Sequence, residues 1–199
     1  MPARRMYSVD ATNQSLLRRV RNPKDSGAWR EFVGLYRPIL VYYARVRRLT
    51  PADAEDVAQA SLKVLVDRMP RFEYCRQKGR FSNWLRGIAE NQIRKLLSQR
   101  RMSQANTSVL RHVRQTEDSE LALWERIWLR DHFRYCLAAI QGEFAATTFE
   151  AFERSVLNEW PVNKVCATLK MNRNQVYLAK SRVLRRLREK MTDLIGYEV

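Results

Sequence analysis

The residues with the clearest chemistry lie near the end of the chain, where a stretch rich in arginine begins. Arg173, Asn174, Gln175 and Tyr177 follow a short polar break. In the major groove of DNA, arginine favours guanine, whereas asparagine and glutamine favour adenine. These side chains are therefore candidates for contacts with base edges.

The same stretch continues with cations of the kind that neutralise phosphates. They are Lys180, Arg182, Arg185, Arg186 and Arg188. A solvated basic helix on a bundle would show the same charge. The break at residues 170–172 separates two predicted helices as in a helix-turn-helix, whose second helix enters the groove by its N-terminal residues. The turn by itself is weak evidence, but together with the net charge of +6 over residues 161–199 it favours DNA binding.

A second group alternates aromatic and basic side chains. It consists of Phe72, Tyr74, Arg76, Lys78, Arg80, Phe81 and Trp84. Unstacked bases stack on exposed rings while nearby cations hold the backbone, so the group is suited to single-stranded DNA. We expect Phe81 and Trp84 to be core residues, and Tyr74 with the loop cations to be exposed.

A third group lies at the acidic start of a predicted helix. Thr50 can cap this helix, and Asp53 and Asp56 complement its positive end. Capping accounts for Asp53 but does not explain why Asp56, Gln59 and Lys63 share a polar face. That face is a candidate surface for a protein partner.

Catalytic and metal-binding patterns are missing from the sequence. Neither His112 nor His132 has a nucleophile in an evident motif, and there is no glycine-rich phosphate loop. Cys75, Cys136 and Cys166 are far apart and form no C-x-x-C pair, which makes a zinc site improbable and is typical of reduced thiols in a cytosol. We expect no enzymatic activity, no metal and no cofactor.

Helical periodicity predicts an all-α protein of two small domains joined by a linker. We expect helices over 28–49, where Pro38 would kink or divide the helix, and over 50–72 and 81–101. A polar, basic loop is expected over 71–80. Four more helices are expected at about 119–141, 147–159, 161–169 and 173–194, with Asn172 capping the last. The predicted domains are 1–101 and 119–199, with a linker over 102–118.

Charge supports this division. The net charge of +16 is unevenly spread: +8 over residues 1–50, +5 over 51–101, −3 over 102–160 and +6 over 161–199. Two basic blocks flanking an acidic middle indicate two DNA-facing modules joined by a segment that does not contact DNA. The N-terminus lacks an apolar signal core and no apolar run reaches membrane-spanning length, so we expect a cytoplasmic protein.

Two stretches together resemble a known family. "DAEDVAQASLKVLVDRMPRF", followed by "GRFSNWLRGIAENQIRKLLSQRR", resembles region 2 of bacterial sigma-70-type factors. "PVNKVCATLKMNRNQVYLAKSRVLRRLRE" is similar to their region 4. With only these two regions and a short linker, the chain resembles the extracytoplasmic-function group.

The resemblance implies partners and roles. The helix carrying Asp53, Asp56, Gln59 and Lys63 would bind core RNA polymerase through the β′ coiled coil, in an assembly that also includes the β subunit. Promoter DNA would be the second partner. Residues of the 71–80 loop and the following helix would open and read the minus-ten element: Tyr74, Arg76, Lys78, Arg80, Asn83, Asn91 and Arg94. Residues of the last helix would read the minus-thirty-five element: Arg173, Asn174, Gln175, Tyr177, Lys180, Arg182 and Arg185.

Three positions depart from the family pattern. Ala60 stands where a glutamate is usual, Lys95 replaces a frequent aspartate, and Gln175 with Val176 replaces a common threonine-valine pair. The first bears on the strength of polymerase binding, and the second on minus-ten contacts.

The resulting hypothesis is a sigma factor, with two alternatives. One is a stand-alone helix-turn-helix regulator, which would have no need of the aromatic and basic region. The other is a basic RNA-binding or scaffold protein. The sequence leaves open the promoter, the inducing signal, an anti-sigma partner and the oligomeric state.

Overall fold

The computed structural model describes residues 14–73, 80–103 and 117–195. All regular elements in these ranges are helical, which confirms the predicted all-α class. The chain divides into two compact units, Met1–Asp131 and His132–Val199. This division falls inside a helix rather than in the expected linker over 102–118, most of which lies outside the described residues. The predicted domain boundaries therefore stay a prediction.

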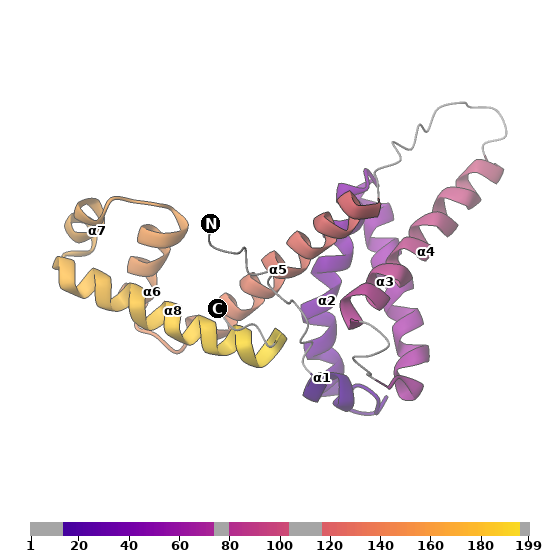
Figure 1. The fold of residues 1–199 in the computed structure, drawn as a ribbon, viewed down its shortest axis with the longest axis horizontal. Helices are drawn as coiled ribbons and strands as arrows, with labels where there is room; N and C mark the ends of the chain where they lie inside the picture. Colours follow the sequence, from indigo (N-terminus) through magenta and orange to yellow (C-terminus); the bar gives the residue numbers. More distant parts are fainter. Residues whose placement is uncertain (1–13, 74–79, 104–116, 196–199) are drawn as a thin grey trace, which may run out of the picture. The chain divides into compact units, whose positions relative to one another are not determined.

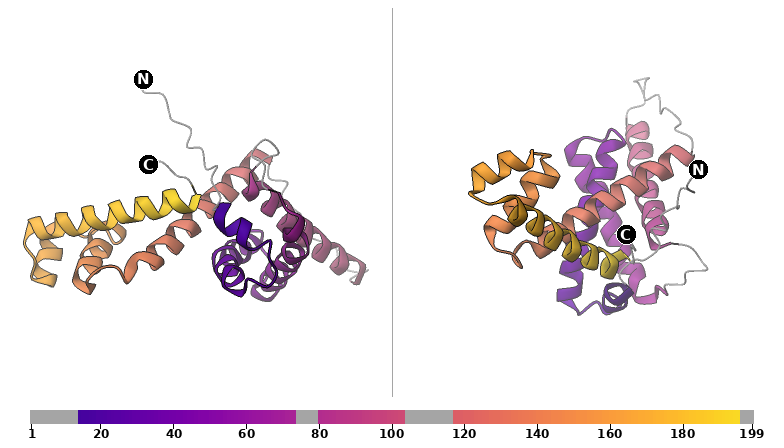
Figure 2. Two further views of the ribbon diagram at one scale, coloured as in Figure 1. Left: turned by 90° about the horizontal axis from the view of Figure 1, so that it is seen from below. Right: turned by 60° about the vertical axis from the view of Figure 1, so that its left-hand side comes forward.

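The first unit contains α1 (Gln14–Arg19), α2 (Ser26–Val46), α3 (Pro51–Arg68), a 3₁₀ turn (Met69–Arg71) and α4 (Phe81–Ser103). It also contains the first half of α5 (Glu117–Gln141). Figures 1 and 2 show α2, α3 and α4 packed side by side. The three long helices follow the predicted ranges closely, whereas α1 was not predicted.

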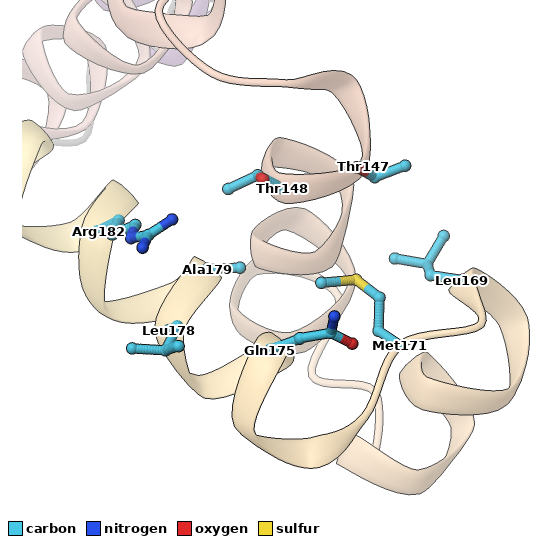
Figure 3. Close-up of a pocket in the computed structure, with 8 residues that line it drawn as sticks. All are labelled: Thr147, Thr148, Leu169, Met171, Gln175, Leu178, Ala179 and Arg182. Atoms are coloured by element: carbon cyan, nitrogen blue, oxygen red, sulfur yellow. The ribbon is translucent and has the colours of Figure 1, made fainter.

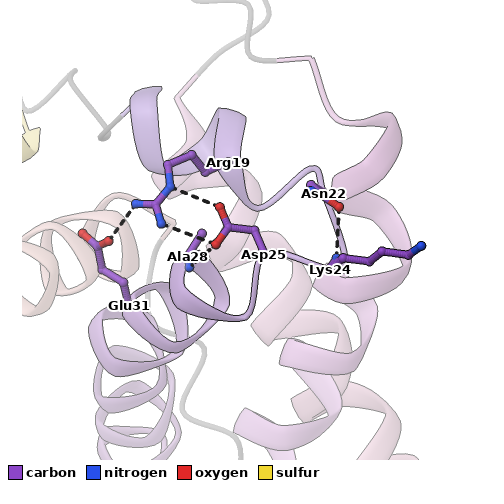
Figure 4. Close-up of polar contacts among 6 residues, drawn as sticks. All are labelled: Arg19, Asn22, Lys24, Asp25, Ala28 and Glu31. Carbon is purple, nitrogen blue, oxygen red and sulfur yellow. Dashed lines mark hydrogen bonds and ion pairs between the residues drawn. The ribbon is translucent and has the colours of Figure 1, made fainter.

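Local sequence signals fix where these helices begin. Thr50 accepts a hydrogen bond from the backbone N–H of Asp53, as predicted, and Pro51 occupies the first turn of α3. At the start of α2, Asp25 accepts from the backbone N–H of Ala28 at 2.8 Å and also pairs with Arg19 of α1 (Figure 4). These bonds lower the pKa of Asp25, the backbone bond most strongly.

Of the two effects expected at Pro38, a kink or a division of the helix, the division does not occur. α2 runs unbroken from Ser26 to Val46 with Pro38 inside it. Pro38 is exposed, while Leu35, Tyr36, Ile39 and Leu40 on either side of it are buried. Because one core receives apolar residues from both sides of the proline, burial outweighs the single lost backbone hydrogen bond.

Aromatic rings fill the core of the first unit. Tyr36 lies 5.3 Å from Phe81 of α4 and 5.5 Å from Trp128 of α5, measured between ring centroids. Trp124 of α5 stands edge-on to Tyr43 at 4.9 Å and donates a hydrogen bond from its indole Nε1 to Ser82 Oγ at 3.0 Å. Both tryptophans are fully buried. The first half of α5 is thus part of this core.

A polar network borders the rings. Arg47 of α2 donates to Glu120 of α5 at 2.6 Å and to Glu90 of α4 at 3.2 Å, and Tyr43 donates its hydroxyl hydrogen to Glu90. Burial, followed by the bond to Glu90, raises the pKa of Tyr43 and keeps the phenol neutral. The network joins three helices of the first unit.

The second unit contains the rest of α5, α6 (Ala146–Phe152), a π-helical turn (Glu153–Leu157), α7 (Val162–Leu169) and α8 (Arg173–Ile195). Figures 1 and 2 show α6 and α7 against the first half of α8. These elements agree with the helices expected at about 147–159, 161–169 and 173–194. One cluster of their core consists of small residues, Ala151, Val165, Val176 and Ala179, and Phe149 and Phe152 of α6 are also buried.

Candidate nucleic-acid and polymerase interfaces

The break between α7 and α8 is a tight turn with defined caps. Lys170 ends α7 in the left-handed conformation, at φ 53° and ψ 40°, and the backbone N–H of Met171 bonds to the carbonyl of Cys166 at 3.1 Å. Asn172 Oδ1 accepts from the backbone N–H of Gln175 at 2.8 Å, and Gln175 Oε1 accepts from that of Asn172 at 2.7 Å. This reciprocal capping box begins α8 at the predicted residue.

The small core holds α8 by one face. Val176, Ala179, Val183 and Leu187 are buried. The seven predicted minus-thirty-five residues are all exposed: Arg173, Asn174, Gln175, Tyr177, Lys180, Arg182 and Arg185. Their side chains are thus accessible along one element, although their contacts with DNA stay a prediction.

Two of these side chains already have partners within the second unit. Arg173 donates from Nε and Nη2 to Oδ1 of Asn163 on α7, at 3.1 and 2.8 Å, which leaves other guanidinium hydrogens for a ligand. Gln175 uses Oε1 in the capping box, so its amide retains its donor nitrogen. A bidentate pair with adenine needs both amide atoms. In this conformation, Gln175 is therefore suited to base acceptors such as thymine O4 rather than to adenine.

Another cation of α8 forms an ion pair within the second unit. Arg186 donates to both carboxylate oxygens of Glu143, at 2.5 and 3.0 Å. The pair lowers the pKa of Glu143 and raises the pKa of Arg186, mainly through the shared hydrogen bonds. Arg186 was expected to contact phosphate, but here it ties α8 to the segment before α6.

A shallow groove lies beside the start of α8 (Figure 3). It is lined by residues of α6, the end of α7, the turn and α8: Thr147, Thr148, Leu169, Met171, Gln175, Leu178, Ala179 and Arg182. Leu178 is absent from the predicted residues, although it is more than half exposed. The signal that was available in the sequence is its position between Gln175 and Arg182, on the face opposite Val176.

The predicted polymerase-binding residues of α3 separate into two kinds. Asp53 is only 4% exposed; it accepts a hydrogen bond from the Thr50 hydroxyl at 2.5 Å and pairs with Arg100 of α4. Asp56, Gln59 and Lys63 of the same helix are exposed. The three exposed residues are available to a partner, whereas the carboxylate of Asp53 is engaged in the fold.

The two departures in this region meet in one groove between α3 and α4. Its lining residues are Asp56, Val57, Ala60, Gln92, Lys95, Leu96 and Gln99. Ala60 contributes only a methyl group, so the hollow lies open between the helices, with Asp56 and Lys95 both among its lining residues. The sequence did not reveal that positions 35 residues apart share a surface.

The predicted minus-ten residues are only partly described. Tyr74, Arg76 and Lys78 lie outside the described residues. Asn83, Asn91 and Arg94 are exposed on α4, where Asn91 and Arg94 are one turn apart and so share a face. Arg80 pairs with Glu125 of α5 at 3.3 Å.

Phe81 and Trp84 differ in burial. Phe81 is buried, as expected for a core residue. Trp84 is half-buried and stacks on Phe72, with 4.5 Å between ring centroids and 25° between ring planes. This stacked pair lies where α4 begins, next to Arg80, and offers an aromatic surface at the edge of the first unit.

The described residues show neither the pattern of a metal site nor that of a membrane-spanning helix. Within them, no three His, Cys, Asp or Glu residues gather as metal ligands, and no helix is long and apolar enough to cross a membrane. Cys136 and Cys166 are free thiols, and burial raises the pKa of Cys136 to about 11. Cys75 lies outside the described residues.

Comparison with known proteins gives a match, which lies within the first unit. Residues 32–102 match the family model of sigma-70 region 2. The matched segment begins at Phe32 in α2 and includes α3 and most of α4. No curated protein matches the chain. The match covers about a third of the chain and shows a similarity of this segment to sigma-70 region 2.

Proposed function

We propose that the protein is a sigma factor that binds core RNA polymerase and directs transcription initiation at specific promoters. The observation that carries the proposal is the match of residues 32–102 to sigma-70 region 2. The exposed Asp56, Gln59 and Lys63 on α3 provide a polar face for the polymerase β′ subunit. Asn83, Asn91 and Arg94 on α4 provide donors for the minus-ten element.

The second unit supplies the rest of the proposed activity. Its capped turn presents α8 with six exposed polar or basic residues and the exposed Tyr177, as reading a minus-thirty-five duplex requires. A chain with these two modules belongs in the extracytoplasmic-function group. Catalysis is left to the polymerase and needs no cofactor here, the site of action is the cytoplasm, and an anti-sigma protein is a candidate regulator.

The decisive experiment is co-elution of the full chain with core RNA polymerase at about 0.15 M salt, where exposed charges are screened beyond roughly 8 Å. A stable stoichiometric complex supports the proposal. Duplex binding without a complex would replace it with a stand-alone regulator. A preference for RNA over duplex DNA would favour an RNA-binding or scaffold protein.

Paired substitutions separate the two proposed surfaces. Asp56→Ala should weaken polymerase binding, while Glu55→Ala should not, because the Glu55 carboxylate pairs with Arg37 at 2.6 Å within the first unit. Arg173→Ala should weaken promoter choice and leave polymerase binding intact. Equal loss of both activities in either variant would contradict the assignment of separate surfaces.

A further inference from the structure

We propose that Leu178, together with Tyr177, recognises the 5-methyl group of a thymine in duplex DNA. The inference rests on the proposed function, in which α8 reads a promoter duplex. It goes further by assigning a specificity-determining role to an apolar residue and by naming the chemical group that this residue contacts.

The position of Leu178 on the helix places it on the outward face. Val176, Ala179 and Val183 are buried and define the inward face. Leu178 follows Val176 by two residues, which rotates it by about 200° around an α-helix. Asn174, four residues before it, and Ser181, three residues after it, share its face and are exposed. This is the face that would enter a groove.

The exposure of the pair is unusual for this helix. Leu178 is 54% exposed and Tyr177 is 56% exposed. A single exposed leucine needs no explanation. Here two large apolar side chains are adjacent, while every other exposed residue between Arg173 and Arg185 is polar or basic. Among the described residues of the second unit, the only other exposed large apolar side chain is Leu157, outside α8.

Charge identifies the occupant as a polyanion. Arg173, Lys180, Arg182 and Arg185 are exposed around the pair. No aspartate or glutamate occurs anywhere between residues 160 and 188. An acid-free, basic face attracts phosphates. The apolar feature that DNA offers in its major groove is the thymine methyl group, so a leucine at the centre of this face is matched to it.

The neighbours of Leu178 complete the recognition of thymine. Gln175 and Arg182 lie one turn before and after it on α8, and all three line the same groove (Figure 3). Gln175 retains its amide nitrogen as a donor, and Arg182 is a donor only. Thymine presents an acceptor, O4, beside its methyl group. A donor next to Leu178 would therefore contact O4 while the leucine covers the methyl group.

The test begins with selection of binding sites from a random duplex library by the full chain, with and without core polymerase. Each thymine of the selected site is then replaced by uracil, which lacks only the methyl group. For one thymine, the replacement should weaken binding by the wild-type chain about fourfold, the equivalent of one buried methyl group. Leu178→Ala should bind both duplexes equally.

The matched control is Leu157→Ala, which removes an exposed leucine from the same unit outside α8 and should keep the wild-type response to uracil. Alanine favours the helix, and Leu178 is exposed, so Leu178→Ala should keep the stability of α8. Two outcomes would overturn the inference alone: no thymine responds to uracil, or Leu178→Ala keeps the full response.

Two further outcomes separate the inference from the proposed function. If Leu178→Ala binds DNA normally but loses affinity for core polymerase, the pair is a protein-docking surface and the inference is wrong. If neither the chain nor its polymerase complex selects any sequence, the inference and the promoter-reading part of the proposed function both fail. Polymerase binding by the Asp56 face is measured separately and is unaffected by either result.

Discussion

Different interactions stabilise the interior of each of the two units. In the first, large rings from α2, α4 and α5 meet in one core, with Tyr36, Phe81 and Trp128 within about 6.5 Å of one another. In the second, one core cluster consists of alanines and valines, Phe149 and Phe152 of α6 are also buried, and the turn and cap between α7 and α8 fix the start of α8. The first unit is stabilised mainly by packed rings, whereas in the second the local backbone hydrogen bonds of this turn also position the predicted DNA-binding helix.

The largest effect should come from removing a ring of the first unit. Trp124→Ala should lower the free energy of unfolding of that unit by about 3–5 kcal/mol, because it empties a fully buried position and leaves Ser82 without its hydrogen-bond donor. Hydrogen exchange followed by mass spectrometry should show faster exchange in α2 and α4. Trp160→Ala, a half-buried ring of the second unit, is the control and should affect α6–α8 instead; the same pattern from both would contradict the comparison.

A smaller loss should follow from the buried acid of α3. Asp53→Ala removes the bond from Thr50 and the pair with Arg100, and should cost about 1–2 kcal/mol in urea unfolding. Asp56→Ala removes an exposed acid from the same helix and should change stability by less than about 0.5 kcal/mol. If Asp53→Ala is equally neutral, the carboxylate has no structural role and returns to the candidates for polymerase binding.

The cap of α8 should matter less for stability than the rings do. Asn172→Ala should cost about 1 kcal/mol in thermal unfolding of the second unit, because the hydrogen bond from the backbone N–H of Gln175 to the Asn172 side chain is lost. Asn172→Gly should cost only a few tenths of that, since glycine is tolerated at this position. A loss of several kcal/mol would show that the second unit depends on this turn as heavily as the first depends on its rings.

The smallest effect should appear on acidification. The pKa of Asp25 in the first unit and the pKa of Glu143 in the second are lowered by their partners from ordinary values of 3.8 and 4.5. Their contribution to stability is therefore present above those values and is lost as the pH falls through the lower folded-state pKa. Asp25→Asn should reduce the loss of stability of the first unit on acidification, and Glu143→Gln should do the same for the second unit. A loss that begins near pH 7 would point to other groups.

The sequence predicted the helices well because their signals are local. Periodicity located α2, α3, α4, α7 and α8, and Thr50 and Asn172 marked two starts. The division expected at Pro38 does not occur, because burial of apolar residues on both sides of it outweighs the local cost of a proline inside a helix. The short α1 was missed, since six residues carry too little periodicity to be recognised.

For the candidate sites, the sequence predicted which residue types are present but not which contacts they make. Residue types and order indicated which helices could contact DNA or a protein, and these side chains are mostly exposed. Spacing did not show that Asp53 turns inward to Thr50 and Arg100, because Arg100 lies 47 residues away. Nor did it show that Asn163 holds Arg173 across the turn.

By itself, the sequence determined the helical class, the helix starts and the basic character of both ends of the chain, because these follow from short-range periodicity, capping and charge. Only the tertiary structure decided which side chains are available. It buried Trp124 and Trp128 in the first unit, brought Ala60 and Lys95 to one groove, placed Gln175 Oε1 in a helix cap and left Leu178 exposed in the second turn of α8. Availability depends on which helices pack together, and residues far apart in the sequence make that packing.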